Sequence, residues 1–368
     1  MEKTVIVGMS GGVDSAAAAF ILKEKGFQVQ GIFLDLYEKK DVDKNGDDSI
    51  RKEHIDDVKK ICDILNITYK ISYYREEFKK NVIDYFINSY INGETPNPCV
   101  VCNKTIKFEK LLEETKTEKN AFLATGHYAD IGFDAGSQRY YIKKGKDEKK
   151  DQSYVLYGLK QETLSTTILP LGKYSKEEIR EIAKEAKLRE IAEKIGLRVA
   201  NKPDSQDICF IPDGNYVGFI EKYTGKKFEK GPFVSSDGKL LGTHNGIIGY
   251  TVGQRKGLGI AAETPYYVLR KNIEQNSIVL GREEELYSKR FKIRDLNFMP
   301  FETLMSPIKL KVKTRYKQKE KDAILFPIDE KTAEAEFIEE QKAITPGQAA
   351  VFYDGDILLG GGIITADS

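Results

Sequence analysis

The chain has 368 residues, 40% hydrophobic and 31% charged, and a chain of this length is expected to form two or three globular domains. This balance excludes a disordered protein, and no apolar run approaches the roughly 20 residues needed to cross a bilayer. A formal net charge of +1 gives no global argument for a nucleic-acid partner, so any such contact depends on local charge.

The start of the chain runs directly into an apolar, strand-like segment, without the layout of a signal peptide. We therefore expect a cytoplasmic protein with no membrane partner. The four cysteines do not make a disulfide framework. In a reducing compartment they are candidates for core residues, metal ligands or reactive thiols.

A strand, a glycine loop, a helix and a second strand are predicted in the first 36 residues. The strands cover residues 4–7 and 27–36, and the helix covers residues 13–25 and ends at Gly26. Such a βαβ unit implies a parallel sheet covered by helices. Further helices are predicted at 54–65, 78–92 and 102–114, and a buried strand at 121–125.

Beyond about residue 200, short strands and glycine turns replace the helical periodicity. Residues 226–239 have the composition of an exposed, turn-rich segment. Strands are predicted at 246–252, 265–269, 277–280, 308–316, 349–353 and 357–359. The predicted fold is a doubly wound α/β nucleotide domain with a parallel sheet (1–203), a central β-rich domain carrying Cys209 (204–285) and a C-terminal β-barrel-like domain (286–368).

The glycine loop has the sequence Ser10-Gly11-Gly12-Val13-Asp14-Ser15 and stands between a strand and a helix. Converging backbone N–H groups and the helix dipole favour an anion there, and glycines let phosphate oxygens approach the backbone. Asp14 would repel a phosphate unless a cation lies between them, which suggests Mg²⁺. The loop matches neither the P-loop nor the dinucleotide fingerprint. It resembles the SGGxDS signature of the ATP pyrophosphatases, which implies splitting of ATP to AMP and pyrophosphate. A glycine-rich turn without a ligand is the competing interpretation.

The cysteines fall into two groups. Cys62 shares one helical face with apolar residues and is predicted to be a core residue. Cys99 and Cys102 stand at a proline-marked turn before a helix, where a thiol is expected to have a lowered pKa. Cys209 is distant in sequence. Half of a zinc site and a thioredoxin-like dithiol remain alternatives, although no second ligand pair is visible.

Taken together, these motifs resemble one family, the tRNA-specific 2-thiouridylases, along nearly the whole chain. The matching stretches are 8–15, 97–108, 124–128, 150–157, 204–211, 249–260 and 345–351. The resemblance implies that ATP is held by Gly8, Met9, Ser10, Gly11, Gly12, Val13, Asp14, Ser15, Leu34 and Gly126.

The resemblance also implies a mechanism. ATP adenylates the C2 oxygen of the wobble uridine, and a persulfide on Cys209 supplies sulfur that a sulfur-relay protein or cysteine desulfurase delivers. Cys102 then frees the product and leaves a transient Cys102–Cys209 disulfide.

One residue departs from the family pattern, because many members have Asp where this chain has Cys99. The result is a CxxC pair plus the distant Cys209, the pattern of thiolases that carry a [4Fe–4S] cluster on three cysteines. Thiolates are the usual ligands of such clusters, so Cys99, Cys102 and Cys209 are candidate metal ligands. The persulfide route and the cluster route both remain open.

Residues 308–316 alternate strictly and predict a strand with Lys309, Lys311, Lys313 and Arg315 on one face. Such a stripe suits a phosphate backbone, although most stripes of this kind are solvated barrel faces. The resemblance implies contacts with the anticodon region of tRNA at Asn97, Pro98, Cys99, His127, Lys150, Asp151, Gln152, Arg315, Tyr316 and Gln348. A satisfied structural histidine is the alternative for His127.

Two other functions remain as alternatives. A ligase or amidotransferase with the same loop would not need the three cysteines, and a non-catalytic RNA-binding or sulfur-carrier protein would not need the loop. Residues 41–48 resemble the start of an EF-hand, but Lys52 stands where a bidentate Glu is required, so we interpret them as an acidic surface loop.

Overall fold

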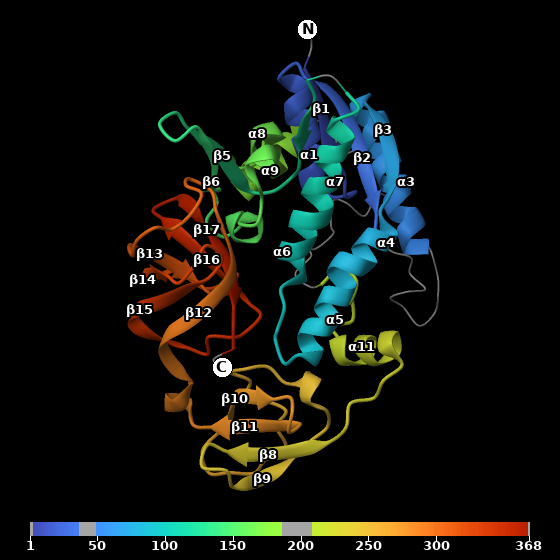
Figure 1. Cartoon of the computed structure of the whole chain (residues 1–368). Coiled ribbons are helices and arrows are strands. Elements are labelled where there is room, and N and C mark those ends of the chain that lie inside the picture. Colours follow the sequence, from blue (N-terminus) through green and yellow to red (C-terminus); the bar gives the residue numbers. More distant parts are fainter. Residues whose placement is uncertain (1–2, 37–48, 119, 186–207, 367–368) are drawn as a thin grey trace. The chain divides into compact units, whose positions relative to one another are not determined.

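The computed structural model describes residues 3–36, 49–118, 120–185 and 208–366. The chain divides into two compact units, which are treated separately (Figure 1). The first unit comprises Met1–Val82, Cys99–Phe210 and Gly355–Leu359. The second comprises Ile83–Pro98, Ile211–Asp354 and Gly360–Ser368.

A five-stranded parallel sheet forms the centre of the first unit, with the strand order β3-β2-β1-β4-β7. Its strands are β1 (Thr4–Gly8), β2 (Gln28–Asp35), β3 (Thr68–Tyr73), β4 (Phe122–Ala124) and β7 (Thr167–Ile168). The strand order reverses beside β1, and ligands in open α/β sheets bind at the carboxyl ends of strands at such a point. The glycine loop follows the carboxyl end of β1.

Helices cover both faces of this sheet. Val5 and Val7 of β1 pack in one apolar cluster with α1 (Val13–Glu24) and α3 (Ser49–Leu65). On the alternate face, a Cβ at Gly8 would lie 3.0 Å from Leu111 of α7 (Glu109–Thr115). The prediction of a doubly wound α/β domain is therefore confirmed. Cys62 is fully buried in the first cluster, as predicted.

Two of the predicted helices are interrupted by π-helical turns. Predicted helix 78–92 is α4 (Arg75–Phe78), a π-helix over Lys79–Ile83 and α5 (Asp84–Ile91). Predicted helix 102–114 starts earlier, as α6 (Pro98–Cys102), and continues through a π-helix over Asn103–Phe108 into α7. Such wide turns inside helices are frequent at functional sites. Here one of them begins immediately after Cys102.

The remaining elements of the first unit lie after β4. A hairpin of β5 (Ala129–Asp134) and β6 (Arg139–Lys144) pairs with the first residues of β17, where Ile357 lies opposite Lys143. The 3₁₀ turn η3 (Ser153–Leu156), α8 (Gln161–Thr166) and α9 (Lys176–Glu185) follow. The hairpin was not predicted, although apolar and polar residues alternate along β5. Its partner β6 has three half-buried residues in a row and no such alternation.

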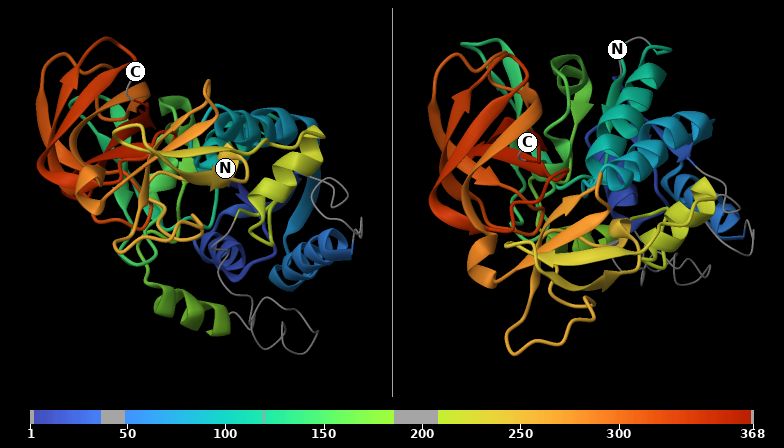
Figure 2. Two further views of the ribbon diagram at one scale, coloured as in Figure 1. Left: turned by 90° about the horizontal axis from the view of Figure 1, so that it is seen from below. Right: turned by 60° about the horizontal axis from the view of Figure 1, so that its bottom comes forward.

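The second unit contains two helices and two β structures. α5 and α11 (Tyr216–Thr224) lie side by side, as Figures 1 and 2 agree, with Phe86 and Phe219 in edge contact. A four-stranded sheet has the order β10-β11-β8-β9. Its strands are β8 (Gly231–Ser235), β9 (Leu240–His244), β10 (Tyr267–Asn272) and β11 (Ser277–Gly281).

Six further strands form a closed barrel in the order β12-β15-β14-β13-β16-β17, completed by pairing of β12 with β17. They are β12 (Tyr287–Phe298), β13 (Ile308–Lys313), β14 (Lys321–Pro327), β15 (Ala333–Lys342), β16 (Ala349–Asp354) and β17 (Ile357–Ile364). The prediction of two β-rich parts after the nucleotide domain is confirmed.

Three predictions about the later part of the chain need correction. The predicted strand 246–252 is instead a 3₁₀ turn, η5 (Ile247–Gly249), which follows Gly246 with a φ of 118°. The segment 226–239, predicted to be an exposed turn, contains β8, whose Phe233 is fully buried. The predicted strand 308–316 ends at Lys313. The acidic loop 41–48 lies outside the described residues.

Candidate active site

The glycine loop closes on itself through the hydroxyls of Ser10 and Ser15. The Ser15 hydroxyl donates to the Gly12 carbonyl at 3.0 Å and accepts from the Ser10 N–H at 3.2 Å. The Ser10 hydroxyl accepts from the Gly12 N–H at 3.3 Å. Gly11 has a φ of 73°, a left-handed conformation that glycine adopts without strain. These hydrogen bonds fix the backbone of the turn that leads into α1.

Gly126 brings the loop after β4 against the glycine loop. A Cβ at Gly126 would lie 2.9 Å from the Asp14 carbonyl carbon and 3.0 Å from the Ser15 nitrogen. No other residue fits there without a shift of backbone. Leu34, the other expected adenosine contact, is half-buried near the end of β2. Its neighbour Asp35 is buried and paired with Arg75 at 2.6 Å.

A lysine that the sequence did not single out reaches the loop. The Lys176 ammonium donates to both carboxylate oxygens of Asp14, at 2.7 and 2.9 Å, and the Tyr128 hydroxyl donates to the same carboxylate at 2.7 Å. Lys176 is 9% exposed and Asp14 is 31% exposed. The loop carboxylate therefore has a cation beside it, and that cation belongs to the protein.

No local pattern distinguishes Lys176, as a residue of the glycine-loop site, from the rest of the chain's 58 Lys and Arg residues. It occupies the first position of α9, after Ser175. The Ser175 hydroxyl accepts from the Glu178 N–H at 3.2 Å, and the Glu178 carboxylate accepts from the Ser175 N–H at 2.6 Å. This capping box fixes where the helix begins and thereby aims Lys176. The capping box is visible in the sequence, but nothing there shows that Lys176 lies next to the glycine loop.

His127 is buried and makes a hydrogen bond of 2.8 Å between its Nδ1 and the Thr125 hydroxyl. Its ring lies 5.5 Å from that of Phe108. Burial, and to a smaller extent Lys107, lowers the pKa of His127 to about 3. The ring is therefore neutral at physiological pH, and its position matches that of a satisfied interior histidine.

The three cysteines Cys99, Cys102 and Cys209 belong to the same unit and are thiols. Cys99 and Cys209 reach the surface as residues, whereas Cys102 is buried. Surrounding protein nevertheless desolvates all three thiols. Cys99 and Cys209 both raise the pKa of Cys102, and Cys99 raises the pKa of Cys209. The charge of a thiolate at Cys99 or Cys209 would therefore be felt at Cys102.

The expected lowering of the thiol pKa is wrong. Burial raises the pKa of Cys102 to about 12, with Lys107 opposing it, and burial first and Cys99 second raise the pKa of Cys209 to about 11. Burial likewise raises the pKa of Cys99. The physical reason is desolvation, which disfavours the charged thiolate and outweighs the opposing charge of Lys107.

Three thiols are the donors that an iron–sulfur cluster requires. Among the residues that the structure describes, however, no three His, Cys, Asp or Glu side chains converge on a position for a metal ion. The donor chemistry fits a cluster and the arrangement does not, so no reaction step is derived through one.

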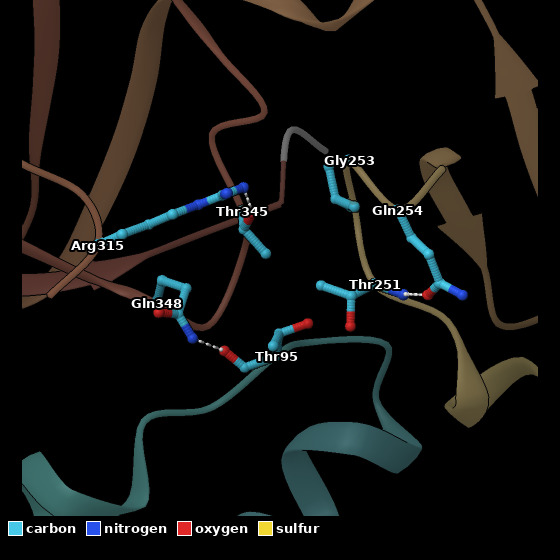
Figure 3. Close-up of a pocket in the computed structure, with 8 residues that line it drawn as sticks. Thr95, Thr251, Gly253, Gln254, Arg315, Thr345 and Gln348 are labelled. Carbon is cyan, nitrogen blue, oxygen red and sulfur yellow. Dashed lines mark hydrogen bonds between the residues drawn. The ribbon is translucent and has the colours of Figure 1, made fainter. Parts of the chain in front are cut away.

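A cavity of about 430 Å³ lies within the second unit and contains two of the expected tRNA contacts, Arg315 and Gln348 (Figure 3). The Arg315 guanidinium donates to the Ala343 carbonyl at 2.8 Å and to the Thr345 hydroxyl at 3.1 Å. The Gln348 amide donates to the Thr95 carbonyl at 2.8 Å. Thr95, Thr251, Val252, Gly253, Gln254 and Thr345 complete the lining.

The other expected tRNA contacts have mixed surroundings. The Asp151 carboxylate accepts from the Gly145 and Ser153 N–H groups at 3.0 and 3.2 Å, and the Gln152 side chain accepts from the Tyr128 N–H at 2.9 Å. Both side chains therefore hold the fold of their own loop. Lys150, Asn97 and Tyr316 are half-buried, and Pro98 is buried at the start of α6.

The basic stripe is shorter than predicted. Lys309 and Lys311 are exposed on β13, while Leu310 and Val312 are buried, as alternation requires. Because the strand ends at Lys313, Arg315 does not belong to this face. None of the helices in the described part of the chain is long and apolar enough to cross a bilayer.

Three family models match the chain: a tRNA methyl transferase HUP domain over residues 3–213, a tRNA methyl transferase PRC-barrel domain over 217–282 and an aminomethyltransferase beta-barrel domain over 288–364. Among solved structures, a predicted subunit of tRNA methyltransferase from Methanocaldococcus jannaschii has a TM-score of 0.33 and 17% identity, over 56% of this chain and 95% of that one. A likeness this weak carries no argument.

The curated relatives match at full length. The tRNA-specific 2-thiouridylase MnmA of Acetivibrio thermocellus is 45% identical over 99% of both chains. That of Clostridioides difficile is 44% identical over 99% of this chain and 98% of its own. At this identity and coverage, the chain belongs to the family of tRNA-specific 2-thiouridylases.

Proposed function

We propose that this enzyme uses ATP to replace the C2 oxygen of a tRNA wobble uridine with sulfur, in the cytoplasm. The observation that carries the proposal is one unit that holds both the glycine loop, with Lys176 on Asp14, and the three free cysteines Cys99, Cys102 and Cys209. An activation site for ATP and a set of sulfur nucleophiles are the two parts that thiolation of a carbonyl carbon needs.

The first step is adenylation. The uridine C2 oxygen attacks the α-phosphorus of ATP, and pyrophosphate leaves with the electron pair of the broken P–O bond. We assign the phosphate oxygens to the backbone N–H groups at the start of α1 and to the hydroxyls of Ser10 and Ser15, which would exchange their hydrogen bonds within the loop for ones to phosphate. We assign to Lys176 the role of stabilising the negative charge that develops on the departing pyrophosphate, because its ammonium is held in a fixed position at the loop. Asp14 is the residue that would hold Mg²⁺, whose charge would offset that of the phosphates.

The second step is sulfur transfer. The terminal sulfur of a Cys209 persulfide attacks C2, and AMP leaves with the oxygen. The Cys102 thiolate then attacks the Cys209 sulfur, which releases the thiouridine and forms a Cys102–Cys209 disulfide. A cellular thiol reduces that disulfide. The surface position of Cys209 suits loading by a sulfur-relay protein or cysteine desulfurase. The burial of Cys102 keeps its thiol from reacting with electrophiles other than the Cys209 sulfur.

The remaining predicted roles stay proposals. They are the division into domains at 203 and 285, the ATP contacts of the loop, Leu34 and Gly126, and the tRNA contacts. For Asp151, Gln152 and Gln348, the internal hydrogen bonds support a role in shaping loops as well as in meeting RNA.

The test is mass spectrometry of nucleosides from tRNA incubated with the enzyme, ATP, and a cysteine desulfurase with cysteine. We expect 2-thiouridine, with AMP and pyrophosphate formed in equal amounts and no product without ATP. AMP formation with no change in the tRNA would indicate another ligase with this loop. RNA binding without ATP turnover would indicate a carrier or binding protein.

A second measurement separates the two sulfur routes, namely iron and acid-labile sulfide in protein purified without oxygen. Iron-free protein that thiolates tRNA supports the persulfide route and makes Cys99 dispensable. About four iron and four sulfide per chain, lost in Cys99→Ala, would replace that route with a cluster held by three thiolates.

A further inference from the structure

The segment 94–96, which precedes Cys99 and Cys102, is hydrogen-bonded to the C-terminal barrel within the second unit. Arg294 of β12 donates to both carboxylate oxygens of Glu94, at 2.8 and 2.9 Å. The side chains of this pair are 35% and 20% exposed, so the pair is partly withdrawn from water. Both contacts come from the Nη2 nitrogen, and the Nη1 nitrogen donates to Asp295 at 2.8 Å. Hydrogen bonds between charged groups such as these are stronger than neutral ones.

The backbone of the same segment is held as well. The Thr95 N–H donates to the Pro346 carbonyl at 2.8 Å, and the Gln348 side-chain amide donates to the Thr95 carbonyl at 2.8 Å (Figure 3). Both hydrogen-bonding groups of one peptide residue are therefore satisfied by the loop between β15 and β16. Free segments leave such groups to water.

Gly347 lets this loop approach so closely. Its φ is 88°, and a Cβ there would lie 2.7 Å from the Thr95 nitrogen and 2.8 Å from the Glu94 Cβ. A side chain at this position would be strained by the backbone conformation and would also collide with the segment. An ion pair, hydrogen bonds to the backbone and the close approach of Gly347 thus all hold Glu94 and Thr95.

We infer that Arg294, Gly347 and Gln348 are positioning residues that act through Glu94 and Thr95, and we call these five residues the barrel clamp. The clamp fixes the chain two residues before Asn97 and four before Cys99. The inference rests on the proposed function, which gives Asn97 a contact with tRNA and makes the cysteines the sulfur site. RNA bound to the barrel and the chain that leads to Cys99 are coupled through this clamp.

This inference changes the expected role of Gln348. The Gln348 amide donates to the Thr95 carbonyl. This side chain therefore supports the segment 94–96 whether or not it also contacts RNA. Loss of a merely structural contact lowers stability, whereas loss of a positioning contact lowers turnover at saturating substrate.

The experiment compares turnover and tRNA affinity in Arg294→Gln, Glu94→Gln and the reversed pair Glu94→Arg with Arg294→Glu. Arg290→Gln is the matched control, because Arg290 lies on the same strand and pairs with Glu336 at 3.0 Å outside the clamp. We expect each single clamp variant to lose about tenfold in kcat with an unchanged Kd for tRNA. The reversed pair should recover only part of this loss, because Arg294→Glu also places a carboxylate beside Asp295. Equal kcat in Arg294→Gln and Arg290→Gln would overturn the inference.

A second measurement reads the clamp without using activity. Hydrogen exchange of peptides that contain Thr95 should be at least about tenfold faster in Arg294→Gln than in the native protein, and unchanged in Arg290→Gln. Unchanged exchange would overturn the inference even if thiolation fell. If the native protein makes no thiouridine, the proposed function fails, while faster exchange in the variant still identifies a clamp.

Discussion

The glycine loop and the barrel clamp are both hydrogen-bonded backbone turns beside a charged pair, yet they are built in opposite ways. In the loop, Ser10 and Ser15 bond to groups no more than five residues away. In the clamp, Arg294 and Gln348 reach residues 200 and 253 positions away. The loop thus needs only its own strand and helix, whereas the clamp exists only when the barrel has formed. Substitutions near the loop should affect ATP chemistry directly, and those in the barrel should act through positioning.

The largest effect is expected at Lys176, a residue distant in sequence that reaches the loop. Lys176→Ala removes the ammonium from Asp14, and we expect kcat for AMP formation to fall about 100- to 1,000-fold, the usual result of deleting a group that stabilises transition-state charge. Lys146→Ala is the matched control, because Lys146 pairs with Glu178 of the same helix at the surface. Equal rates of AMP formation in the two variants would show that Lys176 has no part in activation.

The next effect concerns the exposed thiol. With a pKa raised to about 11, Cys209 is a protonated thiol at pH 7, and its thiolate fraction grows about tenfold per pH unit. Alkylation of Cys209, followed by peptide mass spectrometry, should therefore accelerate about 100-fold between pH 7 and pH 9. A rate that levels off near pH 8.5, the range of an unperturbed thiol, would contradict the raised pKa.

A smaller effect is expected from crowding the loop. Gly126→Ala places a Cβ 2.9 Å from the backbone of Asp14, and we expect ATP affinity, measured by calorimetry, to fall about tenfold as the loop shifts. Gly136→Ala is the control, since its nearest atom would lie at an ordinary 3.6 Å. An unaltered ATP affinity in Gly126→Ala would mean that the loop after β4 does not fix the ATP site.

The smallest effect belongs to the basic stripe. Lys311→Ala removes one exposed cation from β13 and should weaken tRNA binding about two- to threefold, with the slope of log Kd against log salt reduced by about one. Titration at several salt concentrations measures both quantities. A slope equal to that of the native protein would assign Lys311 to an ordinary solvated barrel face.

Sequence predicts the parts of this molecule that depend on neighbours in the chain. The loop at Ser10 to Ser15, the burial of Cys62 and the alternation around Lys311 all follow from local pattern, and the structure agrees. The same local reasoning failed for the thiol pKa, because burial of Cys102 depends on residues far from it in sequence.

Long-range placement explains the rest of what sequence missed. Lys176 lies 162 positions from Asp14 and looked like an ordinary first residue of a helix. Glu94 and Arg294 looked like two surface charges, since nothing local marks their pairing. Gly347 alone carried a hint, because a glycine after a proline suggests an unusual turn, but the segment that it accommodates could not be named.

The measurement that tests the account most directly is thiolation of tRNA by Cys209→Ala, beside Cys62→Ala as a cysteine outside the site. Both variants should bind ATP as the native protein does, because neither residue lies in the glycine loop. We predict that Cys62→Ala forms 2-thiouridine and that Cys209→Ala forms none. Full thiolation by Cys209→Ala would contradict the central claim that this sulfur carries the transfer.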